Sequence, residues 1–286
     1  MIYQPVNENH PQEKEFYENY FIIPAETCKS YFYNAVPENE TDVYIITFNN
    51  LFLAEYQIKT LRRFLKSPFN LIVVDNNNWL YPEESESLFQ LCVRERVVYL
   101  KAPDNFHQRE ISFDPTMKLG TTMNWLYLNC VRKRQPRYFG YLDQDCFLIH
   151  EFDIRSWLGE KGMYGRVVRS AKTEAWTLHV TVNFYRFDFV RNFVLDFRAQ
   201  HNLYLDTGSA NYPIIYKNLN PNDYEITQKT FRFSEQDVNR KNSVQHYEII
   251  DGVWYHMGAS SHDQLAGDGE YKLAYTKGYL DAILND

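Results

Sequence analysis

The chain has 286 residues, with 30 basic and 37 acidic side chains and a formal net charge of −7 at pH 7. Apolar residues make up 44% and charged residues 23%, a composition that is ordinary for globular proteins and excludes disordered and collagen-like chains. The acidic balance argues against a nucleic-acid partner, because neutralising a phosphate backbone needs clustered Lys and Arg. No apolar stretch approaches the roughly 20 residues that span a bilayer, and the N-terminus is polar. We therefore expect a cytoplasmic protein without a transmembrane segment.

Strand and helix patterns alternate through the first half of the chain. Short β-prone apolar runs lie at 43–47, 71–74, 97–100 and 138–142, with helical periodicity between them at 51–65, 84–95 and after Pro115. Asn50 can cap the first of these helices, and Asp114 followed by Pro115 is a typical helix start. Continuous apolar strands alternating with helices are typical of a parallel sheet covered on both faces. We therefore predict an α/β fold with a doubly wound, mostly parallel central sheet flanked by helices.

The second half of the chain has a more mixed pattern. Further strands are expected at 163–169, 177–186, 246–250 and 253–256. The apolar spacing over 187–197 predicts an amphipathic helix. Asp251-Gly252 is a good turn pair and predicts a hairpin between the last two strands.

Two carboxylates, Asp143 and Asp145, stand at alternate positions directly after the fourth predicted strand. Like charges so close repel each other, and a divalent cation resolves the repulsion. Mn²⁺ or Mg²⁺ takes carboxylate oxygens and commonly keeps positions open for substrate phosphates. The alternative is a solvated turn in which each Asp accepts from a backbone N–H. The place of the pair favours the cation, because ligands bind at the carboxyl ends of parallel strands.

In the order of these motifs, the chain resembles the nucleotide-sugar-dependent glycosyltransferases of the GT-A fold, especially the family-2-like group. The resemblance covers about 41–262 and implies specific site residues. The nucleotide sugar would contact Thr47, Asn49, Asp75, Gly120, Asn124 and Asp143. The metal ligands would be Asp143, Asp145 and His256, with His262 as a weaker alternative to the histidine.

The resemblance also implies an activity and a domain layout. The protein would transfer a sugar from a nucleoside-diphosphate sugar, with UDP-sugar as the expected donor, to a glycan or another hydroxyl acceptor. Mn²⁺ or Mg²⁺ would stabilise the diphosphate leaving group. We expect 1–40 to be an N-terminal extension packed on the core, 41–262 a single GT-A-like domain, and 263–286 a mobile tail that can form a helix. Within the domain, 41–150 would bind the nucleotide, and 151–262 would bind the acceptor and close the metal site.

An inverting transferase needs a base for the acceptor hydroxyl, and three acidic residues are candidates. Asp206 follows a short apolar segment, and Glu235 and Asp237 follow Ser234 further on. Asp206 could instead be a helix N-cap, and Glu235 and Asp237 could instead lie in a solvated helix start after Ser234. A retaining mechanism would need none of them as a base, so the stereochemistry stays open.

Other classes of protein fit the sequence less well. A dehydrogenase of the Rossmann type would need G-x-G-x-x-G after the first strand, and a haloacid-dehalogenase phosphatase would carry D-x-D-x-T there. A nucleotidyltransferase would need a Gly-rich basic loop. The serious alternative is a non-catalytic module on the same fold that binds a nucleotide or a carbohydrate.

Trp176 and His179 are candidates for acceptor contacts, although packing in the core is the more common role of a strand tryptophan.

Overall fold

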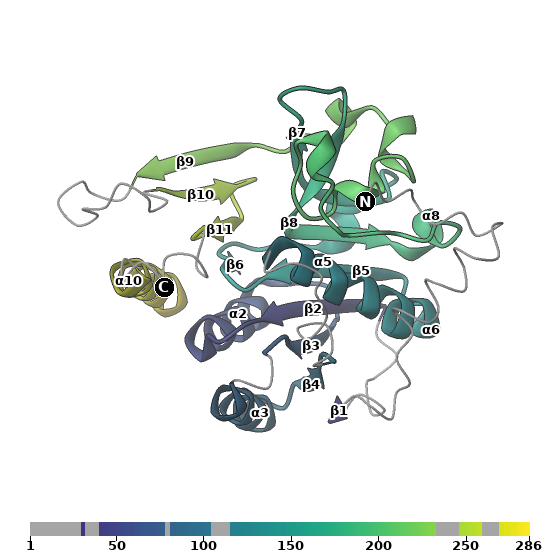
Figure 1. Ribbon diagram of the computed structural model, residues 1–286. Helices are drawn as coiled ribbons and strands as arrows, with labels where there is room; N and C mark the ends of the chain where they lie inside the picture. The colour runs from purple at the N-terminus through teal and green to yellow at the C-terminus, as the bar shows by residue number, and fades with distance from the viewer. Residues whose placement is uncertain (1–29, 32–39, 78–80, 104–114, 233–245, 259–268) are drawn as a thin grey trace.

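The computed structural model describes residues 30–31, 40–77, 81–103, 115–232, 246–258 and 269–286. Within this part of the chain, a central seven-stranded sheet has the order β1-β4-β3-β2-β5-β8-β7 (Figure 1). Its strands are β1 (Ser30–Tyr31), β2 (Thr41–Thr47), β3 (Asn70–Asp75), β4 (Val98–Lys101), β5 (Tyr138–Asp143), β7 (Met163–Arg169) and β8 (Trp176–Arg186).

The sheet is mostly parallel at its centre and mixed at its edges. Strands β4, β3, β2 and β5 are parallel neighbours, β8 is antiparallel to β5, and β7 is antiparallel to β8. Strand β1, from the stretch expected as an N-terminal extension, pairs with β4 in antiparallel register. The predicted fold class, an α/β sheet that is mostly parallel with a mixed second half, is confirmed.

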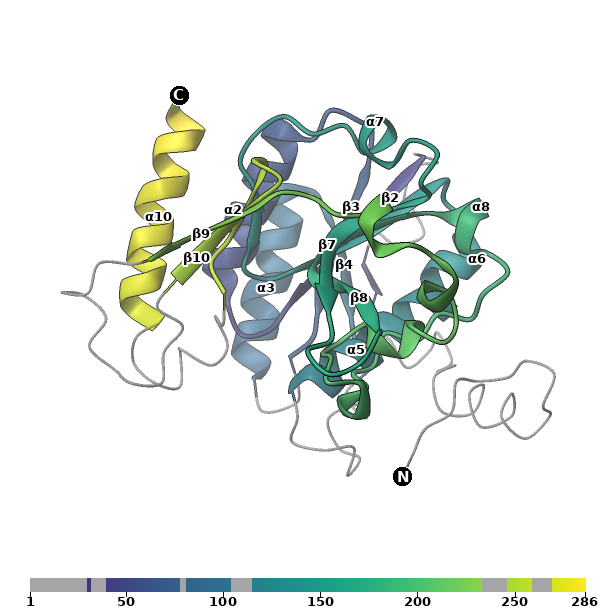
Figure 2. The same cartoon turned by 90° about the horizontal axis from the view of Figure 1, so that it is seen from above.

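Both faces of the sheet are covered, which explains the continuous apolar strands. Val43 and Ile45 of β2 pack under α2 (Leu51–Phe64) and α3 (Pro82–Glu95). Tyr44 and Ile46 face the opposite side, under α5 (Pro115–Leu126). Figure 2 shows these two helical layers on either side of the strands. Helix α5 runs on through a π-helical turn (Tyr127–Val131) into α6 (Arg132–Arg134).

The start of α2 is fixed by the predicted cap. The side chain of Asn50 accepts from the backbone N–H of Leu53 at 3.1 Å, which satisfies one of the helix's unpaired donors. The helix begins four residues after β2 ends, so its first turn lies beside the strand end. Its buried face carries Gln57 toward the neighbouring strand β5.

A second sheet begins where the D-x-D turn ends. Within the described residues it has four strands in the order β6-β11-β10-β9: β6 (Cys146–Leu148), β11 (Trp254–His256), β10 (His246–Ile250) and β9 (Gln228–Arg232). The predicted hairpin is present, with residues 251–253 between the paired Ile250 and Trp254. Asp251 and Gly252 both have positive φ, 53° and 71°, as the central residues of the turn that the Val253 N–H closes onto the Ile250 carbonyl. Because β5 and β6 belong to different sheets, Asp143 to Asp145 lie at the junction between them.

The predicted helix over 187–197 is wrong for most of its length. Helix α8 covers only Phe187–Val190. Beyond it, the backbone N–H of Asp196 donates to Asn211 Oδ1 at 2.8 Å, and that of Phe197 donates to Asn124 Oδ1 at 2.7 Å. These donors are therefore bonded to other parts of the fold, and the helical i−4 pattern cannot form. The remaining short elements are α7 (Ile154–Leu158) and the 3₁₀ turns His201–Leu203, Ser209–Asn211, Tyr216–Asn218 and Pro221–Asp223.

The C-terminal stretch forms a helix that packs on the domain. Helix α10 (Gly269–Asn285) lies beside α2, and its Leu280 is fully buried with Leu53, Phe147 and Tyr255. The helix that we expected as a possibility within 263–286 is thus present over 269–285, where an apolar cluster holds it. Within the described ranges, no helix has both the length and the apolar character needed to cross a membrane.

Gly120 marks a close approach that a side chain would disturb. A Cβ at this position of α5 would lie 2.5 Å from the carbonyl oxygen of Phe197 and 2.7 Å from Cα of Arg198. Both atoms belong to the backbone and cannot rotate away. We expect Gly120→Ala to lower the free energy of unfolding by about 1–3 kcal/mol, measured by urea denaturation. The matched control is Gly278→Ala in α10, where nothing lies within 4 Å and helix propensity predicts a gain of up to about 1 kcal/mol. Equal stability of the Gly120 variant and the wild type would contradict the close approach.

Candidate active site

The polar ends of the central strands meet at one edge of the sheet. Thr47 pairs in register with Asp75, and Ile46 pairs with Asp143, so β2, β3 and β5 end at the same level. Beside them is a cleft of about 280 Å³. Its wall includes Thr47, Asn49, Asn77, Glu83, Glu84 and Ser87.

Side-chain amides tie the strand-end turns together. Gln144 Oε1 accepts from the backbone N–H of Phe48 at 2.9 Å, and Asn77 Oδ1 accepts from that of Asn49 at 2.6 Å. Asn49 has a positive φ of 47°, a conformation that Asn adopts more readily than most residues. The turn after β2 is therefore fixed from both neighbouring strands, which leaves a preformed wall to the cleft.

Asp75 is fully buried and its carboxylate is held by the chain itself. One oxygen accepts from the backbone N–H of Asn77 at 2.9 Å, and the other accepts from the Tyr99 hydroxyl at 2.6 Å. Lys101 Nζ lies 3.3 Å from the same carboxylate. In this structure Asp75 orders the turn after β3, and its contact with a nucleobase stays a prediction.

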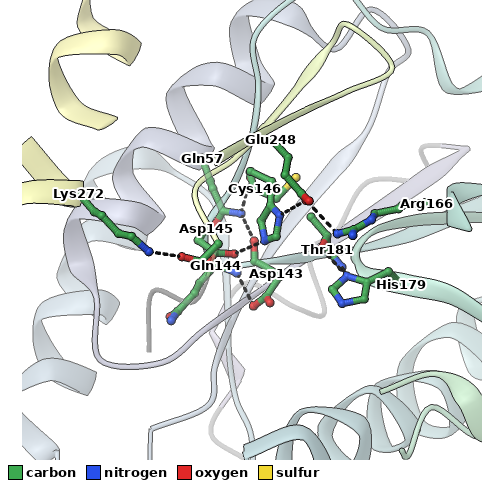
Figure 3. A network of polar contacts seen from close by, with 12 residues as sticks. Gln57, Asp143, Gln144, Asp145, Cys146, Arg166, His179, Thr181, Glu248 and Lys272 are labelled. Atoms are coloured by element: carbon green, nitrogen blue, oxygen red, sulfur yellow. Dashed lines mark hydrogen bonds and ion pairs between the residues drawn. The ribbon is translucent and has the colours of Figure 1, made fainter. Parts of the chain in front are cut away.

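The D-x-D turn is held by a glutamine from α2. Gln57 Nε2 donates to the carbonyl oxygens of Asp143 at 2.7 Å and Cys146 at 2.9 Å, thereby spanning the turn (Figure 3). The carbonyl of Asp145 accepts from the backbone N–H of Met257 at 2.9 Å, which ties the turn to β11. The two carboxylates are thus presented by a backbone that is bonded on both sides.

The late histidine lies against this turn. His256 Nε2 is 3.5 Å from Asp145 Oδ1, and Nδ1 is 3.0 Å from Glu248 Oε2. Burial lowers the pKa of His256, but the two carboxylates outweigh burial and raise it to about 9. A protonated imidazole therefore supplies the positive charge between Asp145 and Glu248 when the chain is alone.

The charge of Asp206 acts on the buried carboxyl group of Asp143. Burial and the Asp145 charge raise the pKa of Asp143 to about 7, and the charge of Asp206 acts in the same direction. Asp206 itself is exposed, and its Oδ1 accepts from the backbone N–H of Thr207 at 2.6 Å. Of the three candidate bases, Asp206 is thus the one whose charge acts on the D-x-D site. Glu235 and Asp237 lie outside the described residues, as does His262.

A second histidine borders the site on strand β8. His179 Nδ1 is 2.5 Å from the Thr181 hydroxyl, and its ring centre is 6.5 Å from that of His256. Burial, together with the Arg166 charge, lowers the pKa of His179 to about 4, so the ring is neutral at pH 7. Trp176, by contrast, is 2% exposed and packs between Tyr216 and Tyr224, which leaves no ring face for an acceptor sugar.

Two of the predicted nucleotide contacts face the 196–198 segment. Asn124 is fully buried, donates to Asp196 Oδ1 at 2.8 Å and accepts from the N–H of Phe197. Gly120 touches the backbone of the same segment. Both residues therefore fix the loop that precedes Asp206, and direct contact of either with a nucleotide stays a prediction.

Sequence reasoning missed four side chains of the site: Gln57, Arg166, Glu248 and Lys272. Glu248 could have been found, because the predicted hairpin places it opposite His256. Lys272 had no such signal. It is fully buried, donates to the carbonyl of Gly258 at 3.1 Å, and points from α10 toward the D-x-D turn in Figure 3.

The carboxylates of Asp143 and Asp145 and the imidazole of His256 are ligand types that suit a hard divalent cation, although they do not form an assembled metal site. Among the described residues, no group of three or more His, Cys, Asp and Glu side chains is placed to hold a metal ion. His256 Nε2 nevertheless lies 3.5 Å from Asp145, and its Nδ1 is bonded to the Glu248 carboxylate, an arrangement that is common for metal-bound histidines. Phosphate oxygens would complete the coordination.

Comparison with known proteins returned distant structural relatives. No family model matches the chain, and no curated protein matches it by sequence. A mannosyltransferase from Pyrobaculum calidifontis, solved in complex with GDP-Man and Mn²⁺, has a TM-score of 0.38 and 11% identity, over 61% of this chain and 50% of that chain. The Mn/GDP form of core-mannan synthase A from Aspergillus fumigatus has a TM-score of 0.38 and 9% identity, over 53% of this chain and 60% of that chain.

Two further solved structures belong to the same class. The mannosyltransferase Ktr4p from S. cerevisiae has a TM-score of 0.38 and 9% identity, over 66% of this chain and 70% of that chain. An active-site mutant of LgtC has a TM-score of 0.36 and 10% identity, over 53% of this chain and 59% of that chain. The structural neighbours are thus glycosyltransferases of the GT-A type. This chain spans about half to two thirds of the length of most of them.

Proposed function

We propose that the protein is a metal-dependent glycosyltransferase that moves a sugar from a nucleoside-diphosphate sugar to a hydroxyl acceptor such as a glycan. The observation that carries the proposal is the junction of the two sheets, where His256 lies 3.5 Å from Asp145 and the charges of both act on Asp143. The cleft lined by Thr47 and Asn49 lies at the ends of the neighbouring strands. The nucleoside would occupy that cleft, next to Thr47 and Asn49. A UDP-sugar is the donor that we expect from the sequence.

Mn²⁺ or Mg²⁺ would be held by Asp143, Asp145 and His256, and when bound it would neutralise the charge that develops on the departing diphosphate. Gln57 fixes the backbone that presents the two carboxylates, so little reorganisation is needed when the donor binds. Lys272 adds a buried ammonium that points toward the same turn.

Asp206 is the base that we propose for an inverting reaction. The bond between the anomeric carbon and the diphosphate oxygen breaks, the acceptor oxygen bonds to that carbon, and the acceptor proton passes to the Asp206 carboxylate. Its exposure suits this role, because a bulky acceptor approaches from solvent. The electrostatic link between Asp206 and Asp143 supports placing the acceptor next to the donor.

A thermal-shift panel tests the donor site directly. The melting temperature would be measured with UDP, GDP, dTDP and CDP, each with and without Mn²⁺. A nucleotide at about 100 times its Kd stabilises the native state by about 2.7 kcal/mol, a rise of about 5 °C for a domain of this size. We expect one nucleotide to give this rise only with Mn²⁺ present. No rise with any nucleotide would overturn the proposal.

The alternative is a module that binds a nucleotide or a carbohydrate without turnover. The incomplete metal cage among the described residues is the observation that favours it. The two functions differ in one measurement, the release of free nucleoside diphosphate from a donor that binds in the panel. Release that depends on Mn²⁺ supports the transferase, and binding without release supports the module.

A further inference from the structure

Glu248 is the buried carboxylate of the site that the proposed chemistry does not use. It lies on β10, directly across from His256 on β11 in the antiparallel register. It is 7% exposed, and its Oε2 is 3.0 Å from His256 Nδ1. The hairpin therefore places a carboxylate on one ring nitrogen of His256, while the other ring nitrogen faces Asp145.

Two further side chains fix the orientation of Glu248. Arg166 of β7 donates to Oε2 at 2.9 Å, and Gln228 of β9 donates to Oε1 at 2.6 Å. Both carboxylate oxygens are thus bonded by groups from different strands. Figure 3 shows Arg166 and Glu248 pointing toward each other beside the D-x-D turn. A carboxylate held in this way cannot turn to another partner without breaking several bonds.

We propose that Glu248 is a positioning residue for the metal site, which keeps the proton of His256 on Nδ1 so that Nε2 offers its lone pair to the cation. This inference rests on the proposed function. Its physical basis is that a carboxylate on Nδ1 fixes both the tautomer and the ring orientation and makes the other nitrogen a better donor. Loss of such a partner typically lowers metal affinity about 10- to 100-fold.

The ion pair with Arg166 distinguishes a positioning role for Glu248 from a role as a metal ligand. A free carboxylate beside Asp143 and Asp145 could bind the cation itself. Arg166 and Gln228 each occupy one oxygen of Glu248, so the carboxylate is committed to the histidine. Glu248 would accordingly act through His256, whereas Asp143 and Asp145 would contact the cation directly.

The test is a direct measurement of Mn²⁺ binding, in the presence of the nucleotide that gives the shift in the thermal panel. Free Mn²⁺ is followed by its electron paramagnetic resonance signal, in a titration of the full chain. We expect Glu248→Ala to weaken Mn²⁺ binding about 10- to 100-fold, and Glu248→Gln to weaken it less, because an amide oxygen can still accept from Nδ1. At saturating Mn²⁺, kcat should return to within a few-fold of the wild-type value.

A matched control is available on the same strand as Arg166. Arg169 of β7 pairs with Glu225, and both side chains of this second Arg–Glu pair are exposed. Glu225→Gln should leave Mn²⁺ affinity unchanged. A circular dichroism spectrum like that of the wild type establishes that each variant is folded, and Glu248→Gln, which keeps the side-chain volume, carries the test if the alanine variant does not fold.

The outcomes separate this inference from the proposed function. Wild-type affinity for Mn²⁺ in the folded Glu248 variants would overturn the positioning role and leave the metal-dependent transferase intact. Absence of Mn²⁺ binding by the wild-type chain, with every nucleotide, would overturn both. Weaker Mn²⁺ binding that saturating metal does not rescue in kcat would also overturn the positioning role, because a positioning residue acts on metal affinity.

Discussion

Asp145→Asn should reduce Mn²⁺-dependent transfer, or donor hydrolysis without an acceptor, by at least about 10²- to 10³-fold. Asn keeps the volume and one oxygen of the side chain but removes the negative charge that faces His256 at 3.5 Å. The carboxylate is 3% exposed, so water cannot take over its role. The measurement is kcat/KM with the donor identified by the thermal-shift panel.

The fold should survive this substitution, because the turn is held through its backbone. Gln57 bonds the carbonyls of Asp143 and Cys146, and Met257 bonds that of Asp145, none of which the substitution changes. A matched control is Asp188→Asn, an exposed carboxylate that pairs with Arg186 on the surface. Undiminished turnover in Asp145→Asn would show that the D-x-D turn does not hold a catalytic metal.

Asp206→Asn is expected to slow transfer by about 10²- to 10⁴-fold while the nucleotide-dependent thermal shift stays unchanged. An amide cannot accept the acceptor proton, yet it can still cap the following turn, where Oδ1 accepts from the N–H of Thr207. The binding of the donor should therefore be separable from its turnover. Kinetics of transfer and the thermal panel, run on the same preparation, check both halves of the prediction.

Asp223→Asn is the matched control for Asp206, since it alters another exposed carboxylate at a 3₁₀ turn. Full transfer activity in Asp206→Asn would remove Asp206 as the base. Glu235 and Asp237 would then be the carboxylates to test in the same assay. Loss of the thermal shift together with turnover would instead place Asp206 in donor binding.

Much of the fold followed from local patterns in the sequence. Apolar runs with β-prone residues identified the central strands, and the cap at Asn50 and the turn at Asp251-Gly252 were found where expected. These features depend on neighbours in the chain, so they can be predicted without knowledge of the fold. The D-x-D pair was likewise identified from its place at the end of a strand.

Contacts between distant segments decided the rest. The helix expected over 187–197 does not form beyond Val190, because backbone donors of that segment bond to Asn124 and Asn211. The C-terminal stretch, which has only a weak pattern of its own, becomes α10 through apolar contacts with α2 and the second sheet. The helix propensity of a segment is only a small free-energy preference, and tertiary contacts of this kind override it.

The candidate site shows the same division. Asp143, Asp145 and His256 were identified by type and order along the chain, which is enough to name the residues that could carry metal chemistry. The crossing from β5 into the second sheet then brings Asp145 to His256. The predicted hairpin already places Glu248 opposite His256, but the ion pair of Glu248 with Arg166 and the effect of the Asp206 charge on Asp143 became visible only in the folded chain. These interactions act through space, between segments whose proximity no local pattern specifies.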